Sequence, residues 1–513
     1  MWYKKNKTIS LIAKLSFVSL FFYFILRVYV YYSAKLGFIN SLFGFTLLLA
    51  ETHSILQSLG FLSRIIRLNK PNANIYRRAK LNLKNLPEVA ILVPGRNEPL
   101  KVLEATFICL ASLNYANKKI YFLDGSDHEL IPANKKLATK YGLIHFAPEN
   151  PSKNKAEIIN KILPTIKSKY VSVFDADQNP MPDFFLEIVP LIEYSKNIAF
   201  VQTPQLYTNI NVGAIAKGAA LQQSIFFENI CEGKSVSNSM FCCGTNFIMQ
   251  TEILKKVGGF DENSITEDFA TSVLIHALGY KSIYYKHVRV FGMAPETLPA
   301  YFKQQYRWSG GTVGVIRKLL PLAYNGKIKL SFIQTWEYFL SATYYFTGWS
   351  FLILIMCPAL YLLFNIPSYF ANPYFYLATF VPYYILTLTT FYATMKKRNY
   401  KVSDVFIGTI MSSLSFPILI QSTLSALLNK KMIFQITNKG KGEVFPIWML
   451  WPWIFVIIIN VAAIVQGVLR YNENHYAIGI NIFWCSYHLL LLISIFKFNK
   501  MPITKEKSIL NYT

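Results

Sequence analysis

The chain has few charged residues, and acidic ones are scarcest. Only 15% of its 513 residues are charged, and 52 lysines and arginines outnumber 27 aspartates and glutamates. Hydrophobic residues make up 53% of the chain, and the mean hydropathy is +0.30. Soluble domains are rarely so apolar. The composition therefore argues against an ordinary soluble protein and favours a membrane protein.

The chain also lacks cysteines spaced for a metal or for a disulfide framework. No Cys-x-x-Cys and no zinc-ligand spacing occurs. We therefore expect reduced thiols in a protein that faces the cytoplasm and the membrane interior. The six cysteines are Cys109, Cys231, Cys242, Cys243, Cys357 and Cys485.

The net charge of +25 is not gathered into one stripe or arm, as it usually is in nucleic-acid-binding proteins. Much of it lies in short clusters next to long apolar runs, where membrane topology and anionic lipid explain it. We therefore expect a lipid bilayer as a partner and no nucleic acid. An anionic soluble substrate, such as a nucleotide, is compatible with the same charge.

Six apolar runs are each close to the roughly 20 residues that cross a hydrocarbon core. They cover about 11–32, 38–62, 344–364, 374–395, 447–469 and 478–498. A seventh run, 405–428, contains Pro417, Gln421 and several hydroxyl side chains. We expect an amphipathic interfacial helix there, with a spanning helix as the alternative.

Six spans place every basic cluster on one side of the membrane, as the positive-inside rule requires. Both termini and the central region are then cytoplasmic, in a multi-pass protein of the inner (plasma) membrane. The expected segments are two spans in 1–70, a cytoplasmic domain in 85–330, interface helices and two spans in 331–433, a loop in 434–445, and two spans with a short basic tail in 446–513.

The central region alternates apolar runs with helical stretches. Strands are expected at 89–94, 120–123 and 170–174, each followed by a polar turn. Such a βαβαβ order predicts a largely parallel sheet, and ligands bind beyond the carboxyl ends of its strands. The candidate residues in these turns are Asn97, Glu98, Asp124, Asp175 and Asp177.

Asp175 and Asp177 stand two residues apart, just after an expected strand. Two ionised carboxylates repel, so a divalent cation completed by phosphate oxygens is a natural third party. The alternative for this pair is an ordinary polar turn. Lys155, taken alone, is a solvated lysine at the start of a helix.

Gln304, Arg307 and Trp308 are spaced to share one helical face. A guanidinium suits an anionic phosphate, and a flat indole ring suits the apolar face of a sugar. The alternative is an ordinary helix with an exposed arginine and a buried tryptophan.

Taken in order, these motifs form a specific set. Asp124, the Asp175-Ala-Asp177 turn, Thr266-Glu267-Asp268 and Gln304-Gln-Tyr-Arg-Trp308 are joined by four further motifs. These are Val201-Gln-Thr-Pro-Gln205, Phe241-Cys-Cys-Gly-Thr-Asn246, Gly292-Met-Ala-Pro-Glu-Thr-Leu298 and Phe434-Gln-Ile-Thr-Asn-Lys-Gly440. Over residues 88–445 the chain resembles the processive, membrane-integrated glycosyltransferases of family 2, and the cellulose synthase catalytic subunits in particular.

The resemblance implies a fold and a set of residue roles. The fold is an α/β GT-A glycosyltransferase domain inserted between about six transmembrane helices (2 + 4), with amphipathic interface helices. Asp268 is implied as the catalytic base. The other implied roles are nucleotide-sugar binding by Asn97, Glu98, Asp124, Lys155, Asp175, Asp177 and Arg307, Mg²⁺ or Mn²⁺ binding by Asp175 and Asp177, acceptor binding by Cys243, Glu267, Gln304 and Trp308, and gating-loop closure by Phe434, Thr437 and Lys439.

The resemblance further implies inverting, processive transfer of glucose from UDP-glucose to a growing β-1,4-glucan, which is translocated across the membrane. A β-1,3-glucan, hyaluronan or mannan is the alternative product, although the Phe434–Gly440 motif argues against hyaluronan. A non-processive membrane sugar transferase is another alternative, and an accessory export subunit is a further partner to consider. A transporter or receptor is disfavoured because the C-terminal spans contain almost no ionisable residues.

Three features bear on how far the resemblance extends. The usual acidic pair before glycine is reduced to Asp124-Gly125, with Asp127 two residues later. Of the adjacent cysteines, Cys243 is aligned with the family's cysteine. The part after the expected gating loop contains two spans and a basic tail. We therefore expect no PilZ domain in this chain, and no sensing of cyclic di-GMP by it.

Overall fold

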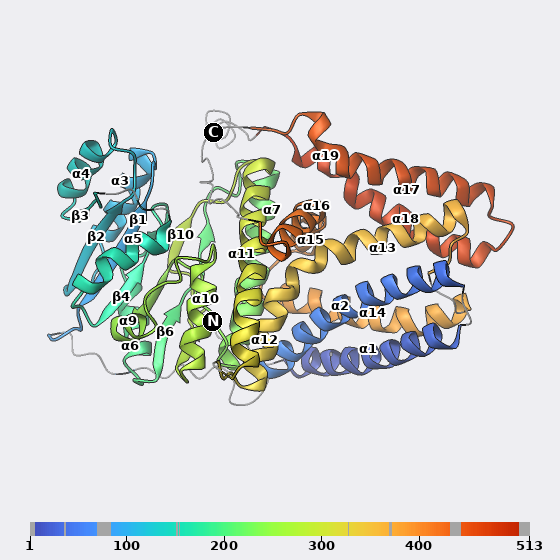
Figure 1. Cartoon of the computed structure of the whole chain (residues 1–513), viewed down its shortest axis with the longest axis horizontal. Helices are drawn as coiled ribbons and strands as arrows, with labels where there is room; N and C mark the ends of the chain where they lie inside the picture. The colour runs from blue at the N-terminus through green and yellow to red at the C-terminus, as the bar shows by residue number, and fades with distance from the viewer. Residues whose placement is uncertain are drawn as a thin grey trace.

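The protein is described by a computed structural model that covers residues 6–34, 37–68, 79, 84–149, 152, 154–326, 328–368, 372–430 and 443–501. It has two parts (Figure 1). An α/β domain built on a twisted sheet lies at one end, and a bundle of long helices extends from it at the other. Helix α11 (Leu298–Tyr324) stands between them, roughly across the direction of the long helices.

The α/β domain is built on a seven-stranded sheet. Its order is β3 (Ile144–Phe146), β2 (Lys118–Asp124), β1 (Val89–Gly95), β4 (Tyr170–Val173), β8 (Phe247–Gln250), β6 (Ile198–Gln202) and β9 (Lys281–Tyr284). All neighbours pair in parallel except β8, which is antiparallel to both β4 and β6. The predicted largely parallel sheet is confirmed, and so are the three predicted strands.

Strand β1 shows why the sheet is buried on both faces. Its first five residues, Val-Ala-Ile-Leu-Val, are fully buried and point alternately into two separate hydrophobic clusters. A continuous apolar run is what a parallel strand covered by helices on both sides requires. On one face lie α3 (Leu100–Ala111), α4 (Ile131–Lys140) and α6 (Phe184–Ile192). On the other lie α5 (Lys155–Ile162), α9 (Thr251–Lys256) and α10 (Glu267–Ala277).

One prediction for this domain is wrong in detail. A single helix was expected between the second and third predicted strands. The chain instead forms α4, the edge strand β3, α5 and a short 3₁₀ turn η1 (Leu163–Thr165) there. Gly142 adopts a positive φ of 74° just after α4, which ends that helix and turns the chain into β3.

A small second sheet connects the α/β domain to the helical part. It consists of β5 (Asn179–Pro180), β10 (Val290–Gly292) and β7 (Leu206–Tyr207). Three consecutive helical segments follow β7, namely α7 (Ala214–Ile225), the π-helical turn η2 (Phe226–Cys231) and α8 (Glu232–Val236). After β10 the Thr297 side chain caps α11 by accepting a hydrogen bond from the Ala300 N–H.

Five helical stretches are long and apolar enough to cross a membrane. They are α1 (Lys7–Ser33), α2 (Phe38–Leu68), Phe332–Phe364, Ile447–Leu469 and His475–Phe498. The last three comprise α12 (Phe332–Thr343), η3 (Tyr344–Phe346) and α13 (Thr347–Phe364), then η4 (Ile447–Leu450) and α17 (Trp451–Leu469), then α18 (His475–Ile493) and α19 (Ile495–Phe498). The protein is therefore a membrane protein whose candidate spans flank the α/β domain.

The remaining predicted span, 374–395, is a continuous helix, α14 (Pro373–Lys396), that packs along α1. It is not among the five because its tyrosines and threonines dilute its apolar character. The ambiguous stretch 405–428 forms two helices, α15 (Val402–Leu414) and α16 (Phe416–Leu427), bent by 47°. They pack on α7 and α11, as interface helices would, and would supply a sixth span only if the bent pair counted as one.

Candidate functional site

The polar turns predicted from the sequence meet at one edge of the large sheet. Asp124 is the last residue of β2, and Asn97 and Asp175 follow the carboxyl ends of the neighbouring strands β1 and β4. Because β8 runs in the opposite direction, the residues before it reach the same edge. There the Asp175 N–H donates to the Thr245 hydroxyl at 3.0 Å.

Asp124 is buried and held by a network that the sequence did not reveal. Its carboxylate accepts hydrogen bonds from the Ser126 N–H at 3.1 Å and the Asn134 amide at 3.1 Å, and His145 Nε2 lies 3.0 Å from it. Burial alone would raise the pKa of Asp124, but the hydrogen bonds from His145 and Ser126 outweigh it and hold the pKa below its usual value. Asp124 is therefore kept ionised.

Asn97 closes the turn after β1 in the left-handed region, at a φ of 55° that asparagine tolerates. Its side-chain amide donates to Asp127 at 2.8 Å, and its amide oxygen accepts from the Asp127 N–H at 2.9 Å. Asp127, the residue by which the motif departs from the family pattern, therefore fixes Asn97. Glu98 is the next residue in this turn and is half-buried.

Lys155 is not a solvated lysine. From the first residue of α5, its ammonium donates to Asp175 at 2.5 Å and to the Gly244 carbonyl at 2.8 Å. Burial would lower the pKa of Lys155, but the nearby Asp175 and Glu267 carboxylates outweigh it and raise the pKa. The ordinary alternative for Lys155 is thus wrong.

Glu267 and Asp268 are the first two residues of α10, and both are desolvated. Burial, and then the charge of Glu267, raise the pKa of Asp268 to about 7. Burial also raises the pKa of Glu267, although Lys155 and Arg307 act in the opposite direction. Asp268 is consequently poised to exchange a proton near neutral pH.

Gly244 brings these groups together. It has a φ of 80°, and a Cβ added to it would lie 2.9 Å from Asp268 Oδ2 and 3.8 Å from Lys155 Nζ. Its backbone therefore occupies the narrow space between the carboxylate and the ammonium, which only glycine allows. The preceding Cys243 N–H donates to Gln202 Oε1 at 2.8 Å, and this fixes the loop.

The Cys243 side chain is half-buried beside this loop. A hydrogen bond with Cys231 and burial hold the pKa of the Cys243 thiol well above its usual value. A neutral thiol at this position can contact a sugar but is a poor nucleophile.

Helix α11 carries Gln304, Arg307 and Trp308, all half-buried, so the predicted helical placement is confirmed. Arg307 acts electrostatically on Glu267, and Gln304 hydrogen-bonds the buried Tyr207. Burial, and then the Asp177 carboxylate, raise the pKa of Tyr207. Through Arg307 and Gln304 the α11 face is therefore linked to both the Asp268 and the Asp177 sides of the site.

The two carboxylates of the Asp-x-Asp turn differ in exposure. Asp177 is buried, at 8% exposure, whereas the Asp175 side chain is 42% exposed. Within the described ranges, no group of three or more histidine, cysteine, aspartate or glutamate residues could hold a metal. The turn offers hard carboxylate oxygens that suit Mg²⁺ or Mn²⁺, but such an ion would need further ligands from water or from a bound phosphate.

The expected gating-loop residues Phe434, Thr437 and Lys439 lie outside the described residues. Sequence reasoning missed His145, Asn134, Thr245, Tyr207 and Gln202 as members of the site. His145, Asn134 and Tyr207 stand on or beside elements that were not foreseen. Thr245 and Gln202 each belong to a quoted motif, and that membership was the available signal.

The comparisons with known proteins agree with this arrangement. Residues 170–393 match the model of glycosyl transferase family group 2. The GT-A type of fold is shared with a solved mannosyltransferase from Pyrobaculum calidifontis in complex with GDP-Man and Mn²⁺, with a TM-score of 0.55 and 15% identity over 76% of this chain and 100% of that one.

The chain is also similar to named proteins over most of its length. The UDP-forming cellulose synthase catalytic subunit of Pseudomonas fluorescens (strain SBW25) is 24% identical over 482 residues, covering 90% of this chain and 63% of the relative. That of Xanthomonas axonopodis pv. citri (strain 306) is 26% identical over 472 residues, covering 88% and 63%. The chain therefore spans less than two thirds of the length of these relatives. The chain is thus similar over most of its length to UDP-forming cellulose synthase catalytic subunits.

Proposed function

We propose that this protein is a processive, inverting glycosyltransferase that polymerises glucose from UDP-glucose into a β-1,4-glucan and translocates the product across the membrane. The observation that carries the proposal is the contact chain from Asp268 past Gly244 to Lys155 and Asp175. A carboxylate with a raised pKa lies on one side of Gly244 and an ammonium paired with a second carboxylate lies on the other, which supports a base beside groups suited to a diphosphate and its metal.

The donor end of the site is the edge where β1, β2 and β4 finish. Asn97, Glu98 and Asp124 would hold the nucleoside, and Lys155 and Arg307 would pair with the diphosphate. A bound divalent cation, held by Asp175 and Asp177, would neutralise the charge that develops on the leaving diphosphate. The GDP-Man and Mn²⁺ bound by the mannosyltransferase of similar fold are consistent with this choice.

Removing the metal or its ligands tests the donor site. Replacing Asp177 with asparagine, or adding EDTA, is expected to lower UDP release from UDP-glucose at least a hundredfold, because the leaving diphosphate loses its charge partner. Lys161→Gln is the matched control, since Lys161 pairs with Glu157 on the far side of α5. A coupled UDP assay with added Mg²⁺ or Mn²⁺ measures the rates. Full activity in EDTA would contradict the metal assignment.

The acceptor end lies between α10 and α11. A sugar hydroxyl is a poor nucleophile, so we assign Asp268 as the group that takes its proton. Trp308 would stack on the terminal sugar, and Gln304, Glu267 and Cys243 would contact its hydroxyls. A single base without a covalent partner predicts inversion, and thus a β-linked product from an α-linked donor.

The pKa of Asp268 predicts a pH profile. The base must be deprotonated, so kcat/KM for UDP-glucose should rise about tenfold per pH unit below pH 7 and level off above it. In a matched profile, Asp261→Asn should keep the same midpoint, because Asp261 pairs with Lys318 outside the site. Rates measured from pH 5 to 9 in membranes give the curve. A profile that falls on raising the pH through 7 would contradict the base assignment.

A cavity in the helical part supports the proposed passage of the product through the membrane. The cavity, of about 620 Å³, lies among α1, α2, α13, α14 and α18. Tyr384, Asn481, Trp484 and Tyr487 line it and offer stacking surfaces and hydrogen bonds suited to a sugar chain. The charged residues Arg27 and Glu51 beside it pair with each other at 2.5 Å, so the cavity wall carries little free charge.

We further propose that the protein resides in the plasma (inner) membrane with the α/β domain cytoplasmic, as the basic clusters predict. The domain boundaries expected from the sequence are kept in this proposal. The proposal also keeps closure of the gating loop over the nucleotide and an accessory export subunit as a partner.

A further inference from the structure

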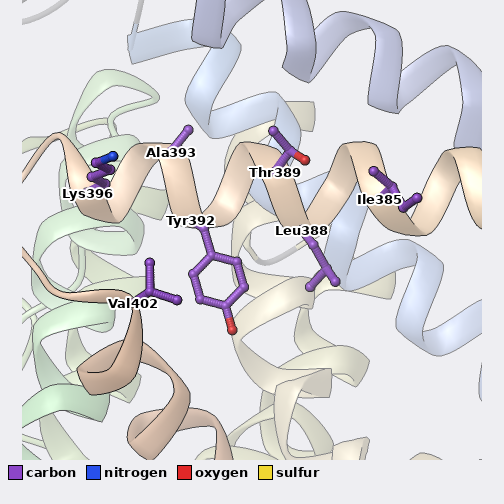
Figure 2. Close-up of a pocket in the computed structure, with 7 residues that line it drawn as sticks. All are labelled: Ile385, Leu388, Thr389, Tyr392, Ala393, Lys396 and Val402. Carbon is purple, nitrogen blue, oxygen red and sulfur yellow. The ribbon is translucent and has the colours of Figure 1, made fainter.

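Besides the candidate functional site, the protein has a groove on α14, far from the Asp-x-Asp turn. The groove, of about 430 Å³, runs along the last turns of α14 and ends at the first residue of α15 (Figure 2). Ile385, Leu388 and Val402 line it, and Figure 2 shows the Tyr392 ring lying between Leu388 and Val402. Among the described residues that line it, Lys396 alone is charged, and it is the last residue of α14.

The mouth of this groove is basic. Lys396 and Lys401 are both exposed, and no carboxylate of the described part of the chain forms an ion pair with either. The acidic residues nearby already have partners. Asp404 pairs with Lys217 at 3.0 Å. Two exposed lysines therefore stand at the α14–α15 turn, of which Lys396 lines the groove and Lys401 directly precedes the lining residue Val402.

Hydrogen bonds and ion pairs hold the α14–α15 turn, which carries these lysines, against η2 and α8. Arg398 donates to Glu228 at 3.2 Å and to Glu232 at 2.5 Å, and Tyr400 donates to Glu228 at 2.5 Å. Glu228 belongs to η2, the π-helical turn that ends at Cys231. Cys231 in turn contacts Cys243 at the edge of the catalytic site.

We propose that this groove binds an anionic phospholipid of the adjacent leaflet. One acyl chain lies along the apolar wall of α14, where burying methylene groups is favourable, and the headgroup phosphate pairs with Lys396 and Lys401. The bound headgroup steadies the α14–α15 turn and, through Arg398, the η2 turn behind Cys243. This goes beyond the proposed function, because it assigns a lipid site and a regulatory role outside the catalytic cleft.

The chemistry of the groove favours a lipid over a helix from another protein. Its described lining is apolar apart from Thr389, the Tyr392 hydroxyl and Lys396, and Lys401 directly precedes the lining residue Val402. An apolar wall with lysines at one end matches a hydrocarbon chain with an anionic headgroup.

The test counts lipids on the full-length protein by native mass spectrometry, without any UDP-sugar. The delipidated protein is titrated with phosphatidylglycerol and with phosphatidylcholine. Phosphatidylglycerol should bind at least tenfold more tightly. Lys396→Gln and Lys401→Gln should each weaken it about fivefold and leave phosphatidylcholine unchanged, since a lysine that pairs with the bound headgroup contributes about that factor.

Two matched controls separate the site from general effects. Lys497→Gln removes an exposed interfacial lysine on α19, and it should bind phosphatidylglycerol like the unaltered protein. Ala393→Trp should fill the groove and weaken both lipids, whereas Ile458→Trp, on an exposed part of α17, should weaken neither.

In nanodiscs, raising the phosphatidylglycerol fraction should increase UDP release by the unaltered protein and not by Lys396→Gln. Equal phosphatidylglycerol binding by the unaltered protein, Lys396→Gln and Ala393→Trp would overturn the proposal. So would equal affinity for the two lipids. Because the lipid count needs no turnover, its outcome does not depend on whether the proposed glycosyltransferase activity is correct.

Discussion

Replacing Asp268 with asparagine is expected to lower polymer formation at least a thousandfold while UDP binding stays within a fewfold of the unaltered protein. Asparagine keeps the shape of the side chain but cannot accept the proton of the acceptor hydroxyl. Asp268 approaches Lys155 without forming the ion pair that Asp175 forms, so the diphosphate contacts survive. Product counting with labelled UDP-glucose measures the first effect, and calorimetry with UDP measures the second.

At high pH, Asp268→Asn should be more stable to unfolding than the unaltered protein. The folded protein holds the Asp268 proton up to about pH 7, whereas the unfolded chain releases it near pH 4. Between these values the folded state binds more protons, so the stability contributed by this group falls as the pH rises and is constant above 7. Asp268→Asn removes the loss of stability that comes from ionising this buried carboxyl. The Tm of the variant should exceed that of the unaltered protein by a few degrees at pH 8 and by almost nothing at pH 4. Surviving polymer synthesis, or a lower Tm at pH 8, would contradict the assignment of a desolvated base.

Replacing Gly311 with alanine should be the most damaging conservative change in α11. A Cβ there would lie 2.6 Å from Thr266 Cγ2 and 3.2 Å from the Thr266 backbone nitrogen. The added methyl must push α11 away from the start of α10, and thus move Arg307 and Trp308 relative to Asp268. Displacements of about 1 Å cost on the order of a hundredfold in rate, and overpacking costs about 1–3 kcal/mol in stability. Polymer formation in membranes and thermal unfolding measure the two effects.

The chain supplies both a control and a rescue for this prediction. Gly314, on the same helix, has nothing within 4 Å of an added Cβ, so Gly314→Ala should leave activity intact and stabilise the helix by about 0.8–1 kcal/mol. Thr266→Ala removes the two nearest atoms, Cγ2 and Oγ1, and the double variant with Gly311→Ala should recover most of the lost activity. If Gly311→Ala were as active as Gly314→Ala, the close packing of the two motifs would not matter for catalysis.

The sequence predicted the central strands because their signals are local. A run such as Val89–Val93 is apolar throughout and ends at a polar turn, so its burial and its carboxyl-end ligands follow from the chain itself. The direction of β8 could not be read in this way. A four-residue apolar strand has the same composition in either direction, and only pairing with β4 and β6 decides it. The position of the loop around Gly244 depends on that choice.

The partners of individual side chains could not be predicted from the sequence either. Lys155 has the sequence context of a solvated helix-start lysine, and its partner Asp175 stands 20 positions along the chain. His145 reaches Asp124 only because β3 pairs with β2 at the edge of the sheet. In the membrane part, apolar length predicted a span at 374–395 as well as the five other stretches. Helix α14 there is less apolar than those five, and its packing on α1 shows that it belongs to the bundle.

The proposed synthesis of a β-1,4-glucan from UDP-glucose can be measured directly. Purified membranes that contain the protein should be given radiolabelled UDP-glucose and UDP-N-acetylglucosamine separately, with Asp268→Asn as the blank, and the products digested with linkage-specific glucanases. We expect a high-molecular-weight product from UDP-glucose alone that a β-1,4-glucanase degrades completely. No polymer from either donor would contradict the proposed activity, and a product cut only by a β-1,3-glucanase would contradict the proposed linkage.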